Sequence, residues 1–155
     1  SIFGEDGALY VSDWQNVIVG HMQHNVRDPN RNKKHGRIYR VTCEGRPLST
    51  HVNVDGQSIG KLLDLLKHPV NGIRQRARVE LSEHPSDKVL AATDKWIAQF
   101  DPKAKEDAHH FLEALWVYQR NDTRNDVLLT QVLNSPVEHA RISAKTVKQF
   151  WDKNL

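Results

Sequence analysis

The stretches Leu66-Lys67-His68-Pro69 and Leu133-Asn134-Ser135-Pro136 decide the fold, because they repeat one short pattern along the chain. An arginine follows each proline at the same distance, Arg74 in the first case and Arg141 in the second. Pro102 stands between them, so the three prolines are 33 and 34 residues apart. Each proline separates two segments with helical periodicity. A period of this length, with two helices per unit, is typical of a helical solenoid.

Six amphipathic helices are predicted after residue 57. In the first, Ile59, Leu62, Leu63 and Leu66 form one apolar stripe at helical spacing. The other five begin near residue 71, after residue 86, near residue 108, near residue 128 and at the capping signal of residues 135–138. Such helices are stable only when packed, so they are expected to form about three stacked hairpins. The alternative is an irregular helical bundle in which the spacing is a coincidence.

The part of the chain before residue 57 has a different character, with most of the glycines and two strand-like runs. Residues 8–12 and 37–42 are rich in residues that favour strands, and Glu5-Asp6-Gly7 is a turn signal before the first. Residues 44–57 carry Gly, Pro and no sustained period. The expected organisation is a β-hairpin at 1–43, a linker at 44–57 and helical repeats at 58–155.

Three segments of the first part, residues 6–14, 20–31 and 35–42, together resemble the last blade of a β-propeller. The resemblance is to the sugar-dehydrogenase-like propellers of large secreted proteins from planctomycetes, often labelled membrane-bound dehydrogenase or haem-binding proteins. In that family HEAT-like repeats follow the propeller, and a cytochrome c domain commonly follows them. The expected fold is therefore mainly α: a HEAT-like α-solenoid of about three hairpins, with the N-terminal β-hairpin as a blade remnant.

The resemblance also implies a function. The chain is expected to be a non-catalytic scaffold or protein-interaction module of a longer periplasmic, cell-surface or secreted protein, docking its propeller, its cytochrome domain or a partner chain. Propellers of this family resemble dehydrogenases that use pyrroloquinoline quinone with calcium, and the longer proteins can also carry haem c. The catalytic groups of such propellers lie on other blades. No catalytic residue or cofactor is therefore assigned to this chain. Two alternatives remain: one wall of the active site of a quinone-dependent sugar or alcohol dehydrogenase, and a free-standing helical-repeat adaptor.

His21, His24 and His35 are the nearest approach to a metal-ligand set in the sequence. Three converging imidazoles can bind zinc or copper. The competing interpretation is that they bond to backbone groups within the blade loop, and no metal is assigned. If the chain forms one wall of an active site, His21, His24, Arg27 and Arg31 are the candidate contacts with substrate or partner.

Charge and cysteine content exclude several classes. The net charge is only +3, and no aromatic residues are interleaved with the basic run that precedes Tyr39, so nucleic-acid binding is not indicated. No apolar run is long enough to span a membrane. The single Cys43 excludes an internal disulfide and a CxxCH haem attachment.

Two structural roles are predicted within the repeats. Arg74 and Arg141 occupy equivalent positions, and each is expected to pair with an acidic residue of the neighbouring unit. The tryptophans of the helical part, Trp96, Trp116 and Trp151, have spacings that favour a place in the core.

Overall fold

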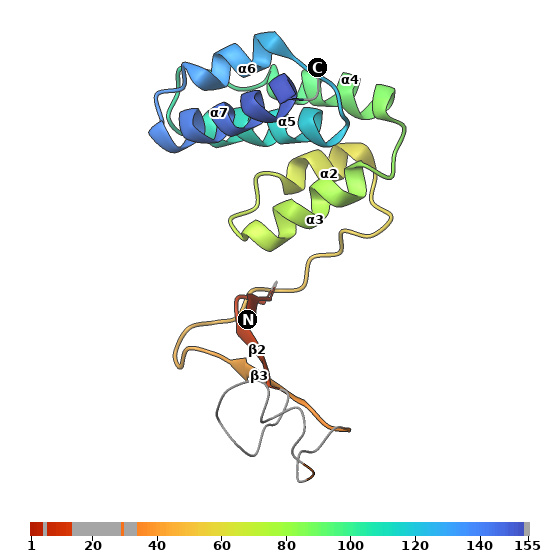
Figure 1. Cartoon of the computed structure of the whole chain (residues 1–155), viewed down its shortest axis with the longest axis vertical. Coiled ribbons are helices and arrows are strands. Elements are labelled where there is room, and N and C mark those ends of the chain that lie inside the picture. Colours follow the sequence, from red (N-terminus) through yellow and green to blue (C-terminus); the bar gives the residue numbers. More distant parts are fainter. Residues whose placement is uncertain (5, 14–28, 30–33, 154–155) are drawn as a thin grey trace. The chain divides into compact units, whose positions relative to one another are not determined.

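A computed structural model describes residues 1–4, 6–13, 29 and 34–153 (Figure 1). The chain divides into two compact units, Ser1–Val52 and Asn53–Leu155. The division falls inside the stretch that the sequence marks as a linker.

The first unit holds a three-stranded antiparallel sheet. Its strands are β1 (Ile2–Phe3), β2 (Leu9–Asp13) and β3 (Arg37–Val41), in the order β1-β2-β3. The register places Leu9 opposite Val41 and Asp13 opposite Arg37. The two predicted strands are present, whereas β1 was not predicted, because two residues are too few to show an alternating pattern.

Asp6 joins the turn before β2 to strand β3. One of its carboxylate oxygens accepts the Ala8 N–H at 3.0 Å, and the other accepts the Tyr10 hydroxyl at 2.8 Å and the Arg40 guanidinium at 2.7 Å. These bonds, first that from Ala8 and then that from Arg40, lower the pKa of Asp6. Gly7 follows with a φ of 79°, a conformation that glycine adopts without strain. The turn predicted here is therefore confirmed, and its aspartate also fixes the adjacent strands.

The second unit contains all six helices found in the described part of the chain, and they match the six predicted segments. Their bounds are α2 Ile59–Leu65, α3 Asn71–Leu81, α4 Ser86–Ile97, α5 Ala108–Arg120, α6 Asp126–Leu133 and α7 Glu138–Lys153. Each predicted apolar stripe lies in a helix, and the largest signalled shift is at α7, which begins at Glu138 and not at Pro136 as the capping signal predicts.

Consecutive helices pack as pairs, α2 with α3, α4 with α5 and α6 with α7. The second helices of the pairs also contact one another, since α3 contacts α5 and α5 contacts α7 (Figure 1). Helix α5 is the most enclosed, with eight buried residues. The apolar stripes meet in one core whose fully buried members include Leu62, Leu66, Ile73, Leu81, Leu112 and Leu115.

The two halves of the repeated sequence pattern have the same local geometry. Arg74 donates from Nη1 to the carbonyl of His68 at 2.7 Å, and Arg141 donates from Nη1 to the carbonyl of Ser135 at 2.8 Å. Both bonds span six residues and hold the turn before the helix. Ala77 and Ala144, one turn further on, are both completely buried. The repeat in the sequence therefore corresponds to a repeat in hydrogen bonding and burial.

The capping signals are only partly realised. Asn125 caps α6 by accepting the N–H of Leu128 at 2.9 Å. Ser135 accepts the N–H of Val137, two residues on, at 3.2 Å, and no bond with Glu138 completes the predicted capping box in the described part of the chain. Ser135 is itself 5% exposed, and this bond gives its buried hydroxyl a partner.

Tyr118 links α5 to α4 and makes the stability of the helical unit sensitive to high pH. Its hydroxyl donates to Asp94 Oδ1 at 2.6 Å. Burial, followed by this bond to a carboxylate, raises the pKa of Tyr118 to about 12.

Because the folded pKa lies above the ordinary value of 10.0, the stability that comes from the neutral phenol is complete below pH 10 and is lost as the pH rises through 12. We expect the free energy of unfolding of the native chain to fall more steeply than that of Tyr118→Phe across this window. Urea denaturation of both proteins at several alkaline pH values measures the difference. Parallel curves would show that the phenol titrates normally in the folded state.

Candidate functional site

A buried carboxylate, Glu113 on α5, gathers three basic side chains from two helices. Its side chain is 0% exposed. Arg74 on α3 donates from Nε to Oε1 at 3.0 Å, and Arg78, one turn further along α3, donates from Nη1 to Oε2. His109, one turn before Glu113 on α5, places Nε2 3.0 Å from Oε1. The contact between α3 and α5 is thus built around one carboxylate.

Opposing influences act on the pKa of Glu113. Burial is the largest and by itself favours the neutral acid. The contacts with His109 and Arg78 act in the opposite direction and together outweigh it, so the pKa of Glu113 is lowered. Glu113 is therefore an ionised structural anion that holds α3 against α5.

This cluster tests the pairing predicted for the two arginines at equivalent repeat positions. Arg74 does pair with an acidic residue of the neighbouring helix pair, as the sequence predicted. Arg141 keeps only the bond to its own turn, and within the described residues no carboxylate pairs with it.

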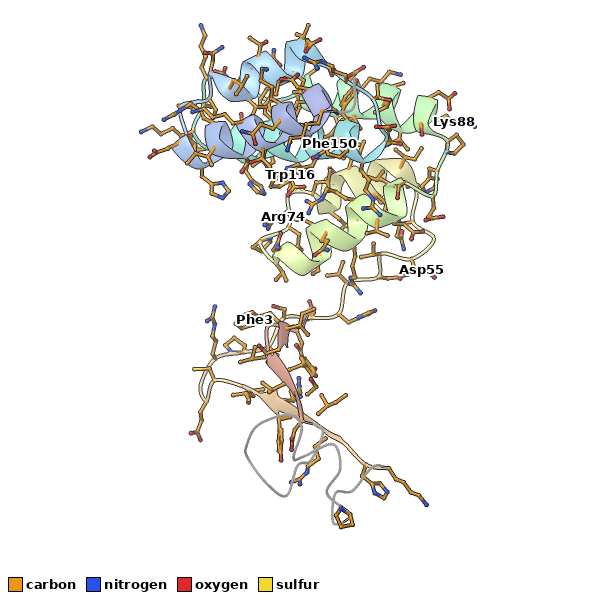
Figure 2. The ribbon with its side chains drawn as sticks, viewed as in Figure 1. Phe3, Asp55, Arg74, Lys88, Trp116 and Phe150 are labelled. Carbon is orange, nitrogen blue, oxygen red and sulfur yellow. The ribbon has the colours of Figure 1, made fainter. Side chains whose placement is uncertain are left out.

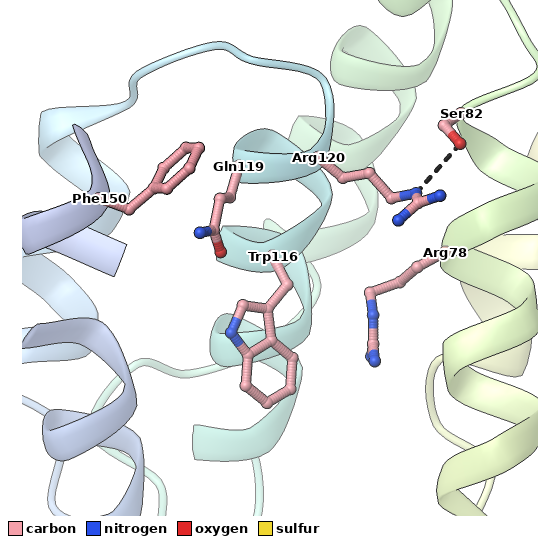
Figure 3. A pocket seen from close by; sticks show the side chains of 6 residues that line it. All are labelled: Arg78, Ser82, Trp116, Gln119, Arg120 and Phe150. Carbon is pink, nitrogen blue, oxygen red and sulfur yellow. Dashed lines mark hydrogen bonds between the residues drawn. The ribbon is translucent and has the colours of Figure 1, made fainter. Parts of the chain in front are cut away.

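Beside the cluster, a groove of about 530 Å³ opens on the second helix of each pair (Figure 3). Its walls come from α3, α5 and α7, and the lining residues are Arg78, Ser82, Trp116, Gln119, Arg120 and Phe150. Two cations, two aromatic rings and two neutral hydrogen-bonding groups thus share one concave surface.

The arginines of the groove differ in their partners. Arg78 is committed to Glu113, and its guanidinium carbon also lies 4.9 Å from the centre of the Trp116 ring, a cation–π contact. Arg120 is exposed and donates from Nε to Ser82 Oγ at 3.1 Å, the bond drawn in Figure 3. No ion pair between Arg120 and a carboxylate forms among the residues described. Its Nη1 and Nη2 edge therefore remains for a ligand.

Trp116 is not a core residue, and this part of the sequence prediction was wrong. Trp96 and Trp151 are both 5% exposed and buried as predicted, whereas Trp116 is only partly buried and lines the groove. The pattern misled because Trp116 continues the apolar face of α5 while lying at its border. Phe150, on α7, is 42% exposed and completes the aromatic part of the groove.

The residues named as candidate contacts from the sequence are mostly not described by the structure. His21, His24, Arg27 and Arg31 lie outside the described residues. His35 is described and exposed. Within residues 1–4, 6–13, 29 and 34–153, no three His, Cys, Asp or Glu side chains are grouped to hold a metal ion. The second helix of each pair is the docking surface expected of such a scaffold, but neither the residues of the groove nor Glu113 were named as site residues from the sequence. The signal for Glu113 is a single charge inside the apolar run Phe111–Leu115.

Comparison with protein families, with curated proteins and with solved structures found no match to this chain. Among the helices that the structure describes, none has the length and apolar character needed to cross a lipid bilayer.

Proposed function

We propose that this chain is a non-catalytic protein-interaction module whose three helix pairs form a HEAT-like α-solenoid. The single observation that carries the proposal is the origin of the groove. Five of its six lining residues lie on α3, α5 and α7, the second helix of each pair, and the sixth, Ser82, directly follows the end of α3. A stack of helix pairs presents one such face along its length, and this is the surface with which repeat proteins bind their partners.

The repeated arginine geometry supports the solenoid arrangement. Arg74 and Arg141 make the same bond to the turn six residues earlier, and Arg74 adds the bond to Glu113 of the next pair. One side chain therefore fixes the turn within its own pair and the contact between pairs. A stack of repeats is stabilised by such contacts within each repeat and between adjacent repeats.

The charges at the groove favour binding over catalysis. Glu113, whose carboxylate binds the groove residue Arg78, is buried, is held by two guanidiniums and has a lowered pKa. A general base needs a pKa near the working pH and access to the substrate, and Glu113 has neither. Arginine, tryptophan and phenylalanine are instead the side chains that dominate protein interfaces.

The setting inherited from the sequence resemblance belongs to the same proposal. The module would belong to a longer propeller dehydrogenase-like protein and dock its propeller, its cytochrome domain or a partner chain. Pyrroloquinoline quinone, calcium and haem c would belong to that parent, in a periplasmic, cell-surface or secreted setting. The alternative of an active-site wall depends on His21, His24 and Arg27, and no described feature favours it.

A turnover assay tests the non-catalytic part of the proposal. The chain is incubated with a panel of sugars, alcohols and aldehydes, pyrroloquinoline quinone, Ca²⁺ and an artificial electron-acceptor dye. We expect the rate of dye reduction to equal that of the cofactor alone. A saturable rate that scales with protein concentration would overturn the proposal and restore the dehydrogenase alternative.

A further inference from the structure

We propose that the groove between α3, α5 and α7 binds an acidic peptide segment that also carries an aromatic or aliphatic anchor residue. This inference rests on the proposed function and adds the chemistry of the partner. It follows from three properties of the lining residues: their unbalanced charge, their exposed rings and their spare hydrogen-bonding groups.

The charge around the groove is positive. The groove's lining residues include Arg78 and Arg120 and no carboxylate. Arg74 and Arg78 share the buried carboxylate of Glu113, whereas Arg120 has no part in that pairing. With its Nε bonded to Ser82, the two terminal nitrogens of Arg120 form a fork that matches a carboxylate. Asp and Glu side chains of a partner supply that group, so charge complementarity selects an acidic segment.

The rings add an apolar part to the same surface. Figure 3 shows the Trp116 indole between Arg78 on α3 and the side chain of Phe150 on α7. Arg78 lies over the indole and holds it in place, which limits the entropy lost when a ligand packs on it. Partly exposed Trp and Phe beside a cation form an anchor pocket for one large side chain of a peptide.

Gln119 supplies the remaining requirement, which is recognition of a peptide backbone. Its amide carries both a donor and an acceptor, and it makes no side-chain hydrogen bond within the described part of the chain. A peptide backbone presents the same two groups along its length. A nucleic acid would bring phosphates and bases in large number, and the groove offers only one uncommitted guanidinium for them.

Selection from a phage library of random twelve-residue peptides, using the full chain as bait, tests the proposal. We expect the enriched peptides to contain Asp or Glu together with an aromatic or aliphatic residue. A representative synthetic peptide, labelled with fluorescein, then gives the affinity by fluorescence anisotropy. Arg120→Glu is expected to weaken its binding about tenfold or more, and added salt to weaken it further.

Lys88→Glu is the matched control, since it makes the same charge change at an exposed position of α4 outside the groove (Figure 2). Lys88→Glu should leave the peptide affinity within about twofold of the native value. The affinity of Arg120→Gln should lie between those of the native protein and Arg120→Glu. Circular dichroism of each variant shows whether it is folded. Competition with an oligodeoxythymidylate of equal length tests the nucleic-acid alternative.

The outcomes separate the two proposals. If no peptide is enriched, both the interaction module and its acidic ligand fail. If peptides are enriched without acidic residues, or if Arg120→Glu and Lys88→Glu act alike, the module stands and the ligand class is wrong. If the oligonucleotide displaces the peptide at equal concentration, the groove binds polyanions generally and the proposal of an acidic peptide is overturned.

Discussion

Replacing Glu113 with glutamine is expected to lower the free energy of unfolding by about 3–5 kcal/mol. Glutamine has nearly the same shape but no charge, so the guanidiniums of Arg74 and Arg78 would lose the carboxylate that they share. Their side chains are 14% and 16% exposed, and water replaces the lost partner poorly at such positions. Urea denaturation followed by far-UV circular dichroism at neutral pH measures the change.

The matched control is Asp64→Asn, which removes the charge from an exposed pair. Asp64 lies 2.6 Å from Lys67, but its side chain is 64% exposed. Such pairs contribute about 0–1 kcal/mol. If the two variants lost equal stability, the buried cluster would be no more important than a surface pair, and its role in joining α3 to α5 would be contradicted.

Glu113→Gln is also expected to change how stability depends on low pH. Because the folded pKa of Glu113 is lowered from 4.5, the stability contributed by its charge is present above that value and is lost as the pH falls through the folded pKa. The difference between the native chain and Glu113→Gln should therefore be constant near neutrality and shrink below pH 4.5. A purely steric effect of glutamine would persist at all pH values.

The helices were predictable from the sequence because each carries its own signal. Apolar residues at helical spacing mark the buried stripe, and proline marks four of the five connections between helices, so all the information lies within one segment. Strand β1 shows the opposite case. Ile2 and Phe3 are recognisable only through their pairing with Tyr10 and Leu9, and a two-residue strand has no periodicity to detect.

The site was less predictable because it is assembled from distant parts of the sequence. Arg74 was expected to pair with an acidic residue, but its partner Glu113 lies 39 positions away and could not be named from spacing. Arg78, Trp116 and Phe150 meet only when three helix pairs are stacked. Periodicity assigns a residue to a helix face, but it does not show which residue at the border of that face is left exposed.

Replacing Trp151 with alanine is the second change with a large expected effect. Trp151 lies on α7 and is 5% exposed, so its removal leaves a cavity in the core. Such substitutions cost about 3–5 kcal/mol of unfolding free energy. Trp116→Ala should cost clearly less, because the indole of Trp116 is partly exposed and its removal opens space toward the groove instead of the interior. Urea denaturation of the two variants under the same conditions makes the comparison.

Trp151→Phe separates the packing of this side chain from its polarity. The indole Nε1 of Trp151 is buried and has no hydrogen-bond partner in the described part of the chain. An unsatisfied buried donor costs about 1–3 kcal/mol, so phenylalanine removes a penalty while keeping most of the ring. We therefore expect Trp151→Phe to retain most of the stability that alanine loses. If Trp151→Ala and Trp116→Ala lost equal unfolding free energy, the division of the tryptophans into core and groove would be contradicted. A residue at the edge of the groove should contribute less to the packing of the helices than a buried one.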